Sequence, residues 1–193
     1  QAALDAGDTH PLELPARSLG RSILDDWTAW EGDLDLPERT CHGDLKISNI
    51  RFAAETDRAI CLIDLDTVGP MPLACELGDA WRSWCNPAGE DAPDAARFDL
   101  SIFEASAKGF LATAPALAAA ERSSLVGGVE RICLELAGRF CADALQNNYF
   151  REDRERFPVV GAHNLHRAQC QLSLARAAHA ARPACEHILA LAG

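Results

Sequence analysis

Residues 40–52 of this chain read TCHGDLKISNIRF and place many polar side chains between two apolar segments. Residues 39–42 and 50–53 are short candidate strands, so the polar residues fall in a loop between them. A loop held at both ends by strands keeps its side chains in a fixed relation. This stretch is therefore the first candidate for a functional site.

The apolar run AICLIDL at residues 59–65 is the strongest β-strand signal in the chain. The intervening AETDR supplies turn residues, so residues 50–65 predict a β-hairpin. A continuous apolar run is typical of a strand buried on both faces, and we expect such burial here. Asp64 then stands where this strand ends.

Asp44, Asn49 and Asp64 form a pattern suited to phosphoryl transfer. The order H-x-D-x-x-x-x-N, followed by a later Asp, is the layout of the kinase catalytic loop and its metal-binding carboxylate. Phosphoryl transfer needs a carboxylate near the acceptor hydroxyl and oxygen ligands for Mg²⁺ on the nucleotide phosphates. The alternative is that Asp44 and Asn49 only stabilise turns.

The remaining segments predict helices, so the expected fold is mainly α with a small β-hairpin (α+β), in a single domain of residues 1–193. We divide it into a leading helical segment (1–38), a catalytic and metal-binding hairpin (39–70) and a helical acceptor-binding subdomain (71–193). The expected helices are 15–31, 74–85, one from an Asp94 N-cap to about Leu111, 116–147 with an interruption near Gly127 and Gly128, and one from His163 that Pro183 kinks or divides.

Composition limits the other classes of function. The net charge of −11 argues against a nucleic-acid surface, which needs clustered Lys and Arg. No apolar run approaches the ~20 residues that span a bilayer, so no membrane partner is expected. The eight cysteines include no CxxC pair, and we expect free thiols in the cytoplasm. His163, His166 and Cys170 share a helical face and form an alternative metal site that lacks a clear fourth ligand.

The segments HGDLKISN and CLIDLDTVGP…ELGDAWR resemble the aminoglycoside phosphotransferase and choline kinase superfamily, small-molecule relatives of protein kinases. The resemblance implies an ATP- and Mg²⁺-dependent kinase of small molecules with the C-terminal lobe of a protein-kinase-like fold. The roles that it implies are Asp44 as catalytic base, Asn49 and Asp64 as Mg²⁺ ligands, Lys46 toward the transferring phosphate, and His42 as a loop-shaping residue. Asp66 is either a further group near the metal or a solvent-facing side chain.

The later segments RFCADALQNNYF and HNLHRAQCQL are similar in order and spacing to N-acetylhexosamine 1-kinases, which phosphorylate an amino sugar at its anomeric hydroxyl. By that resemblance Arg139, Asp143 and Tyr149 face a sugar, and Asp79 ties down the catalytic loop. The alternatives are ordinary salt bridges and a half-buried ring for the first three and a surface position for Asp79. Aminoglycosides, choline-like amines and homoserine stay open as acceptors.

The β-rich N-terminal lobe of such kinases is missing from this sequence. The segment before the loop looks helical and holds no lysine, since Lys46 is the first in the chain. That lobe carries the lysine that pairs with the nucleotide phosphates. We therefore expect the chain to be part of a larger protein and to be inactive alone. A non-catalytic helical binding module is the alternative from another class.

Overall fold

The part of the chain that the structure describes, residues 10–32 and 35–192 of a computed structural model, is mainly helical. Of the leading segment 1–38, residues 1–9 and 33–34 lie outside this part. The described helices are α2 (Glu13–Ala29), α3 (Leu73–Trp84), α4 (Leu100–Thr113), α5 (Ala119–Gln146) and α6 (Ala162–Leu191). The described strands are β1 (Glu38–Cys41), β2 (Ile50–Phe52), β3 (Ala59–Leu62) and β4 (Gly69–Pro72).

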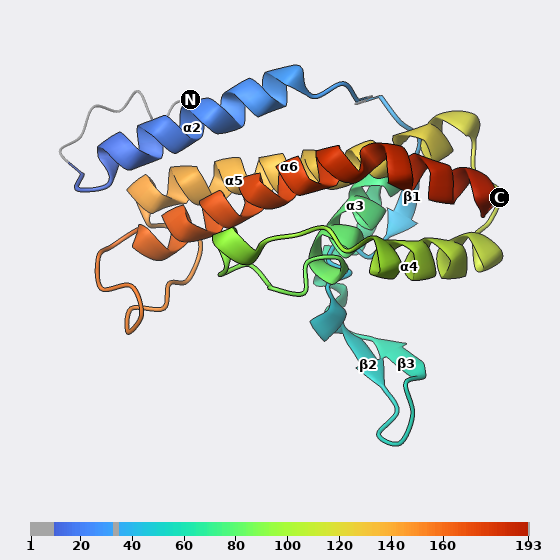
Figure 1. Ribbon diagram of the computed structural model, residues 1–193. Helices are drawn as coiled ribbons and strands as arrows, with labels where there is room; N and C mark the ends of the chain where they lie inside the picture. Colours follow the sequence, from blue (N-terminus) through green and yellow to red (C-terminus); the bar gives the residue numbers. More distant parts are fainter. Residues whose placement is uncertain (1–9, 33–34, 193) are drawn as a thin grey trace.

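The two long helices α5 and α6 lie side by side and form the centre of the molecule (Figure 1). Helices α2 and α3 pack on α5, while α4 packs on α6. Their facing side chains form one core, in which Trp81, Phe103, Leu125 and Leu174 are fully buried. None of the described helices is long and apolar enough to cross a membrane.

Helix α5 runs without a break through Gly127 and Gly128, so the expected interruption there is wrong. These glycines serve close packing instead. A Cβ atom at Gly128 would lie 2.0 Å from the Ala74 carbonyl oxygen, and one at Gly78 would lie 2.5 Å from the Gly128 carbonyl oxygen. The backbones of α3 and α5 therefore touch, which only glycine permits. This contact sets the position and rotation of α3.

Helix α6 is also continuous and contains Pro183, so the expected division of the helix is wrong. Ala178 and Cys185, on either side of the proline, are both buried. Packing against the core on both sides holds the two parts in one helix, although proline removes a backbone hydrogen bond.

The start of α4 differs from the expectation that Asp94 is its N-cap. Asp94 lies in a short 3₁₀ turn, and the helix begins at Leu100 after Asp99. The Asp99 Oδ1 accepts hydrogen bonds from the amides of Ser101 (3.0 Å) and Ile102 (3.3 Å). Asp99 thus supplies the acceptor that the free amides of the first turn need.

The expected hairpin is present, because β2 and β3 pair antiparallel with Ile50 opposite Leu62. A second antiparallel pair, β1 with β4, places Cys41 opposite Gly69 and was not expected from the sequence. Its strand β4 reads GPMP, and prolines disfavour a strand assignment. The β1–β4 pair closes the base of the segment that carries the polar loop and the hairpin.

The expected burial of the strand at 59–65 is wrong. All four residues of β3 are exposed, including Ile60 at 56% and Leu62 at 45%. Figure 1 shows the hairpin extending away from the helices. The apolar side chains of β3 therefore have no buried environment within the described part of the chain.

Candidate active site

The polar loop begins directly after β1 with His42 and Gly43, whose conformation other elements enforce. Gly43 has a φ of 84°, and a Cβ atom there would lie 2.6 Å from the Thr67 carbonyl oxygen. The His42 Nδ1 accepts from the amide of Asp44 (3.3 Å), which leaves Nε2 to donate to the carbonyl of Ile63 (3.0 Å). The Thr67 hydroxyl donates to the His42 carbonyl (2.8 Å). The imidazole thus links the loop to the segment leading to Asp64.

Glu76 on α3 anchors the same loop from the helical side. Its Oε1 accepts from the amide of His42 (2.9 Å) and its Oε2 from the amide of Gly43 (2.8 Å). The side chain is 6% exposed, so these amides replace water as partners of the carboxylate. Asp79, expected in this role, instead pairs with Arg82 at 2.9 Å. The loop anchor is one helical turn earlier than the sequence predicts.

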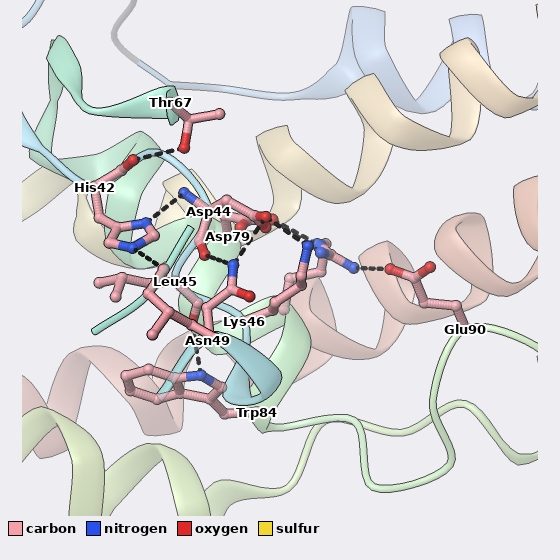
Figure 2. Close-up of polar contacts among 11 residues, drawn as sticks. His42, Asp44, Leu45, Lys46, Asn49, Thr67, Asp79, Trp84 and Glu90 are labelled. Carbon is pink, nitrogen blue, oxygen red and sulfur yellow. Dashed lines mark hydrogen bonds and ion pairs between the residues drawn. The ribbon is translucent and has the colours of Figure 1, made fainter. Parts of the chain in front are cut away.

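Asp44, Lys46 and Asn49 meet in the loop (Figure 2). The Lys46 ammonium lies 2.5 Å from the Asp44 Oδ2, and the Asn49 Nδ2 donates to the same oxygen (3.0 Å) and to the Asp44 carbonyl (2.9 Å). The hydrogen bond and charge of Asp44 raise the pKa of Lys46, despite partial desolvation. The Trp84 indole donates to the Leu45 carbonyl (2.8 Å) and holds the backbone between these residues. The Asp44 Oδ1 has no hydrogen-bond partner among the described residues.

Asp64 follows β3 in the left-handed conformation, with a φ of 66°. A hydrogen bond between the Asp64 and Asp66 carboxyl groups, with the charge of Asp66, raises the pKa of Asp64. The same hydrogen bond lowers the pKa of Asp66. Asp44 and Lys46 are close enough to act on Asp64 electrostatically. The residues after the hairpin thus turn back toward the loop.

The oxygen atoms of Asp64, Asp66 and Asn49 suit Mg²⁺ better than a metal ion that would need all of its ligands from the protein. No cluster of three His, Cys, Asp or Glu side chains able to hold a metal occurs among the described residues. Asp64 and Asp66 offer adjacent carboxylates, and the Oδ1 of Asn49 makes no hydrogen bond within the described chain. Mg²⁺ characteristically takes one or two carboxylates and completes its shell with water and substrate phosphates. The residues present therefore fit that ion.

A cavity of about 530 Å³ opens beside the loop. Asp44 and Lys46 line it from the loop, and Arg139 lines it from α5 together with Tyr149 from the following segment. Arg82 also lines the cavity and is clamped between Asp79 and Glu90. The structure therefore brings Asp44, Arg139 and Tyr149 to one space, with the Asp44 side chain on its wall.

Asp143, expected to face a sugar, is buried and anchors a loop instead. It is 3% exposed and accepts from the amides of Asn148 (3.0 Å), Tyr149 (3.0 Å) and Phe150 (2.8 Å). The chain can return to this carboxylate because Asn147 ends α5 in the left-handed conformation. The expectation for Asp143 is wrong, yet its hydrogen bonds hold Tyr149 beside the cavity.

The alternative metal site at His163, His166 and Cys170 is not formed within residues 10–32 and 35–192. His163 Nε2 contacts the Asp91 carboxylate (2.9 Å), and His166 Nε2 contacts the Asp91 carbonyl (2.9 Å). The Cys170 thiol donates to the carbonyl of Gly89 (3.4 Å). These side chains fasten the loop before α4 onto α6.

Glu76 and Trp84 are the site residues that the sequence reasoning missed. Both belong to the stretch ELGDAWRSW, whose first part carries the family resemblance. The signal was therefore present, but it did not show which carboxylate faces the loop.

Residues 2–115 match the profile of the phosphotransferase enzyme family. This match covers more than half of the chain and includes the polar loop, the hairpin, α3 and α4. The long helices α5 and α6, which supply the other wall of the cavity, lie beyond it.

Proposed function

Because this chain belongs to the phosphotransferase enzyme family, we propose that it carries the catalytic residues of an ATP- and Mg²⁺-dependent kinase that phosphorylates a hydroxyl group of a small molecule. The observation that carries the proposal is the Asp44 carboxylate on the wall of the cavity. Lys46 and Asn49 bind its Oδ2 and so fix the Asp44 side chain, which also fixes the position of Oδ1.

In this proposal Asp44 orients the acceptor hydroxyl and accepts its proton through Oδ1. Lys46 lies against Asp44 and can also reach the transferring phosphoryl group, where its positive charge stabilises developing negative charge. Asn49 and Asp64 would hold Mg²⁺, and Asp66 lies beside Asp64. The metal, when bound, neutralises charge on the nucleotide phosphates.

We further propose a sugar or amino sugar as acceptor, phosphorylated at its anomeric hydroxyl. A cavity of about 530 Å³ has room for a monosaccharide. Its wall combines the aromatic rings of Tyr149 and Phe150 with charged and polar groups, a combination suited to a sugar's apolar face and hydroxyl groups.

The nucleotide requires a further binding surface, and we propose that an N-terminal lobe of the same protein supplies it. The hairpin supports this proposal, because Ile60, Leu62 and Leu65 expose apolar side chains next to Asp64. Such an exposed apolar surface is typical of an interface. In this arrangement residues 1–193 are the C-terminal lobe of a protein-kinase-like fold.

The eight cysteines are free thiols, and six of them are buried. Free thiols persist in reducing compartments, which supports a cytoplasmic location for this kinase.

The test is Asp44→Asn in a chain that includes the sequence upstream of Gln1, assayed by ADP release and by mass spectrometry of the acceptor. We expect kcat to fall by about 10²–10⁴-fold, the usual contribution of a general base. The control is Asp57→Asn, which changes an exposed carboxylate in the hairpin turn. Activity of Asp44→Asn within about threefold of the parent would favour the non-catalytic binding module.

A further inference from the structure

The cations that line the cavity differ in their partners. Three of them pair with carboxylates of the chain: Lys46 with Asp44, Arg82 with Asp79 and Glu90, and Arg167 with Asp91. Arg139 is the fourth, and it forms no ion pair with any residue in the described part of the chain. Glu135, four residues before it on α5, is instead held by Arg131 at 2.8 Å, and Asp143, four residues after it, accepts from backbone amides.

Arg139 nevertheless contacts two aromatic rings. Its guanidinium carbon lies 5.3 Å from the ring centroids of both Tyr149 and Phe150. These rings contact each other edge-on at 4.7 Å, and Phe150 packs on Phe140 at 4.3 Å. Asp143 fixes the backbone of the aromatic pair. The guanidinium thus lies beside the aromatic pair, with the side chains of Arg139 and Tyr149 exposed to solvent.

A guanidinium has five N–H donors, and none of those of Arg139 donates a hydrogen bond to a residue in the described part of the chain. The edge of a guanidinium matches the two oxygens of a carboxylate or phosphate. The five acidic residues that line the cavity have other partners. Glu76 accepts from backbone amides, and Glu135 pairs with Arg131. Asp44 pairs with Lys46, and Asp79 and Glu90 pair with Arg82. The cavity therefore offers one cation that has no ion-pair partner among residues 10–32 and 35–192.

We propose that the acceptor carries an oxyanion, a carboxylate or a phosphate, in addition to the hydroxyl that reacts, and that Arg139 binds this group. The proposal rests on the proposed kinase function and names the substrate class of the same cavity. It favours an acidic sugar over a cationic acceptor such as an aminoglycoside or a choline-like amine, because a cation would meet Arg139 with like charge.

The test compares acceptors that differ only at C6: glucose with glucuronate and galactose with galacturonate, with glucose 6-phosphate as a phosphate source. In the chain that includes the upstream sequence, we expect kcat/KM to be at least about tenfold higher for the best oxyanion than for its neutral partner, as one charge-assisted contact allows. In Arg139→Gln this ratio falls to about one. The relative rates of uronates and sugar phosphate show which oxyanion is preferred.

Arg21→Gln is the matched control, because Arg21 is an exposed helical arginine on α2 that does not line the cavity. We expect this variant to keep the preference for the oxyanion. Circular dichroism checks that Arg139→Gln is folded, and Arg139→Lys, which keeps the charge without the planar edge, should keep only part of the preference.

Calorimetric titration of residues 1–193 with glucuronate, galacturonate and glucose 6-phosphate separates the two proposals. If no acceptor is phosphorylated but one of these anions binds in an Arg139-dependent manner, the kinase proposal fails and the Arg139 site stands. If neutral sugars are phosphorylated as well as the anionic ones, the kinase proposal stands and the Arg139 site is refuted. Absence of any Arg139-dependent binding or rate advantage for the anionic compounds likewise overturns it.

Discussion

Glu76→Gln removes one of the two carboxylate oxygens that hold the loop before Asp44. In the native protein Oε1 accepts from the amide of His42 at 2.9 Å and Oε2 from the amide of Gly43 at 2.8 Å. Glutamine has nearly the same shape as glutamate, so the cavity keeps its shape. Its NH₂ group, however, must face one of the two amides, and that amide then has no acceptor.

The size of the effect follows from the two hydrogen bonds. Leaving a buried amide unsatisfied costs about 1–3 kcal/mol, and replacing a charged by a neutral acceptor at the other amide costs about 1 kcal/mol. We therefore expect the free energy of unfolding to fall by about 2–4 kcal/mol. Because the loop carries Asp44, we also expect kcat to fall in a chain that contains the proposed N-terminal lobe. The change in the KM of the acceptor should be smaller.

Urea denaturation followed by tryptophan fluorescence measures the loss of stability. Glu135→Gln is the control, since it makes the same chemical change on the wall of the same cavity but breaks only a half-exposed i,i+4 ion pair with Arg131. Its expected cost is about 0.3–0.5 kcal/mol. If Glu76→Gln is no more destabilised than Glu135→Gln, the carboxylate does not anchor the loop as described.

Two further predictions concern contacts that position the loop and β1. Trp84→Phe removes the 2.8 Å hydrogen bond to the Leu45 carbonyl. We expect the free energy of unfolding in urea to fall by about 1 kcal/mol and kcat to fall in a chain that contains the proposed N-terminal lobe. Unchanged values of both would refute the role of Trp84 in holding the loop. Arg39 lowers the pKa of Glu121 from 4.5 to about 2. Since the unfolded chain takes up this proton first, the stability advantage over Glu121→Gln should be full above about pH 5 and shrink toward pH 2, as measured by urea midpoints. An advantage that is constant down to about pH 3 would contradict this linkage.

The polar loop could be predicted from the sequence because its polar residues are close together along the chain. Asp44, Lys46 and Asn49 lie within a few residues of one another, so a single loop brings them together. The hairpin was predictable for the same reason, since its turn and strands are adjacent along the chain. The burial of β3 was not predictable, because apolar side chains indicate a preference for contact without identifying the partner.

The identity of the loop anchor depends on the rotation of α3, which is not a local property. Glu76 and Asp79 lie one turn apart on the same side of a helix, so spacing alone leaves either one able to face the loop. The rotation is set by the contact of Gly78 and Gly128 between α3 and α5. That contact joins segments far apart in the sequence. A glycine in each of two helices does not show, from sequence alone, which residues of the other helix it contacts.

Glu76 and Asp143 share a physical role that their sequence contexts conceal. Each is a nearly buried carboxylate that accepts several backbone amides, and each holds a segment that lines the cavity. A buried carboxylate needs donors, and the amides of an irregular segment need acceptors, so the two requirements satisfy each other. The resemblance of the later segments suggested substrate contact for Asp143, yet Glu76 and Asp143 act by holding Gly43 and Tyr149 in place. The proposed contacts with the acceptor therefore fall to Asp44 and Arg139, whose partners are incomplete among the described residues.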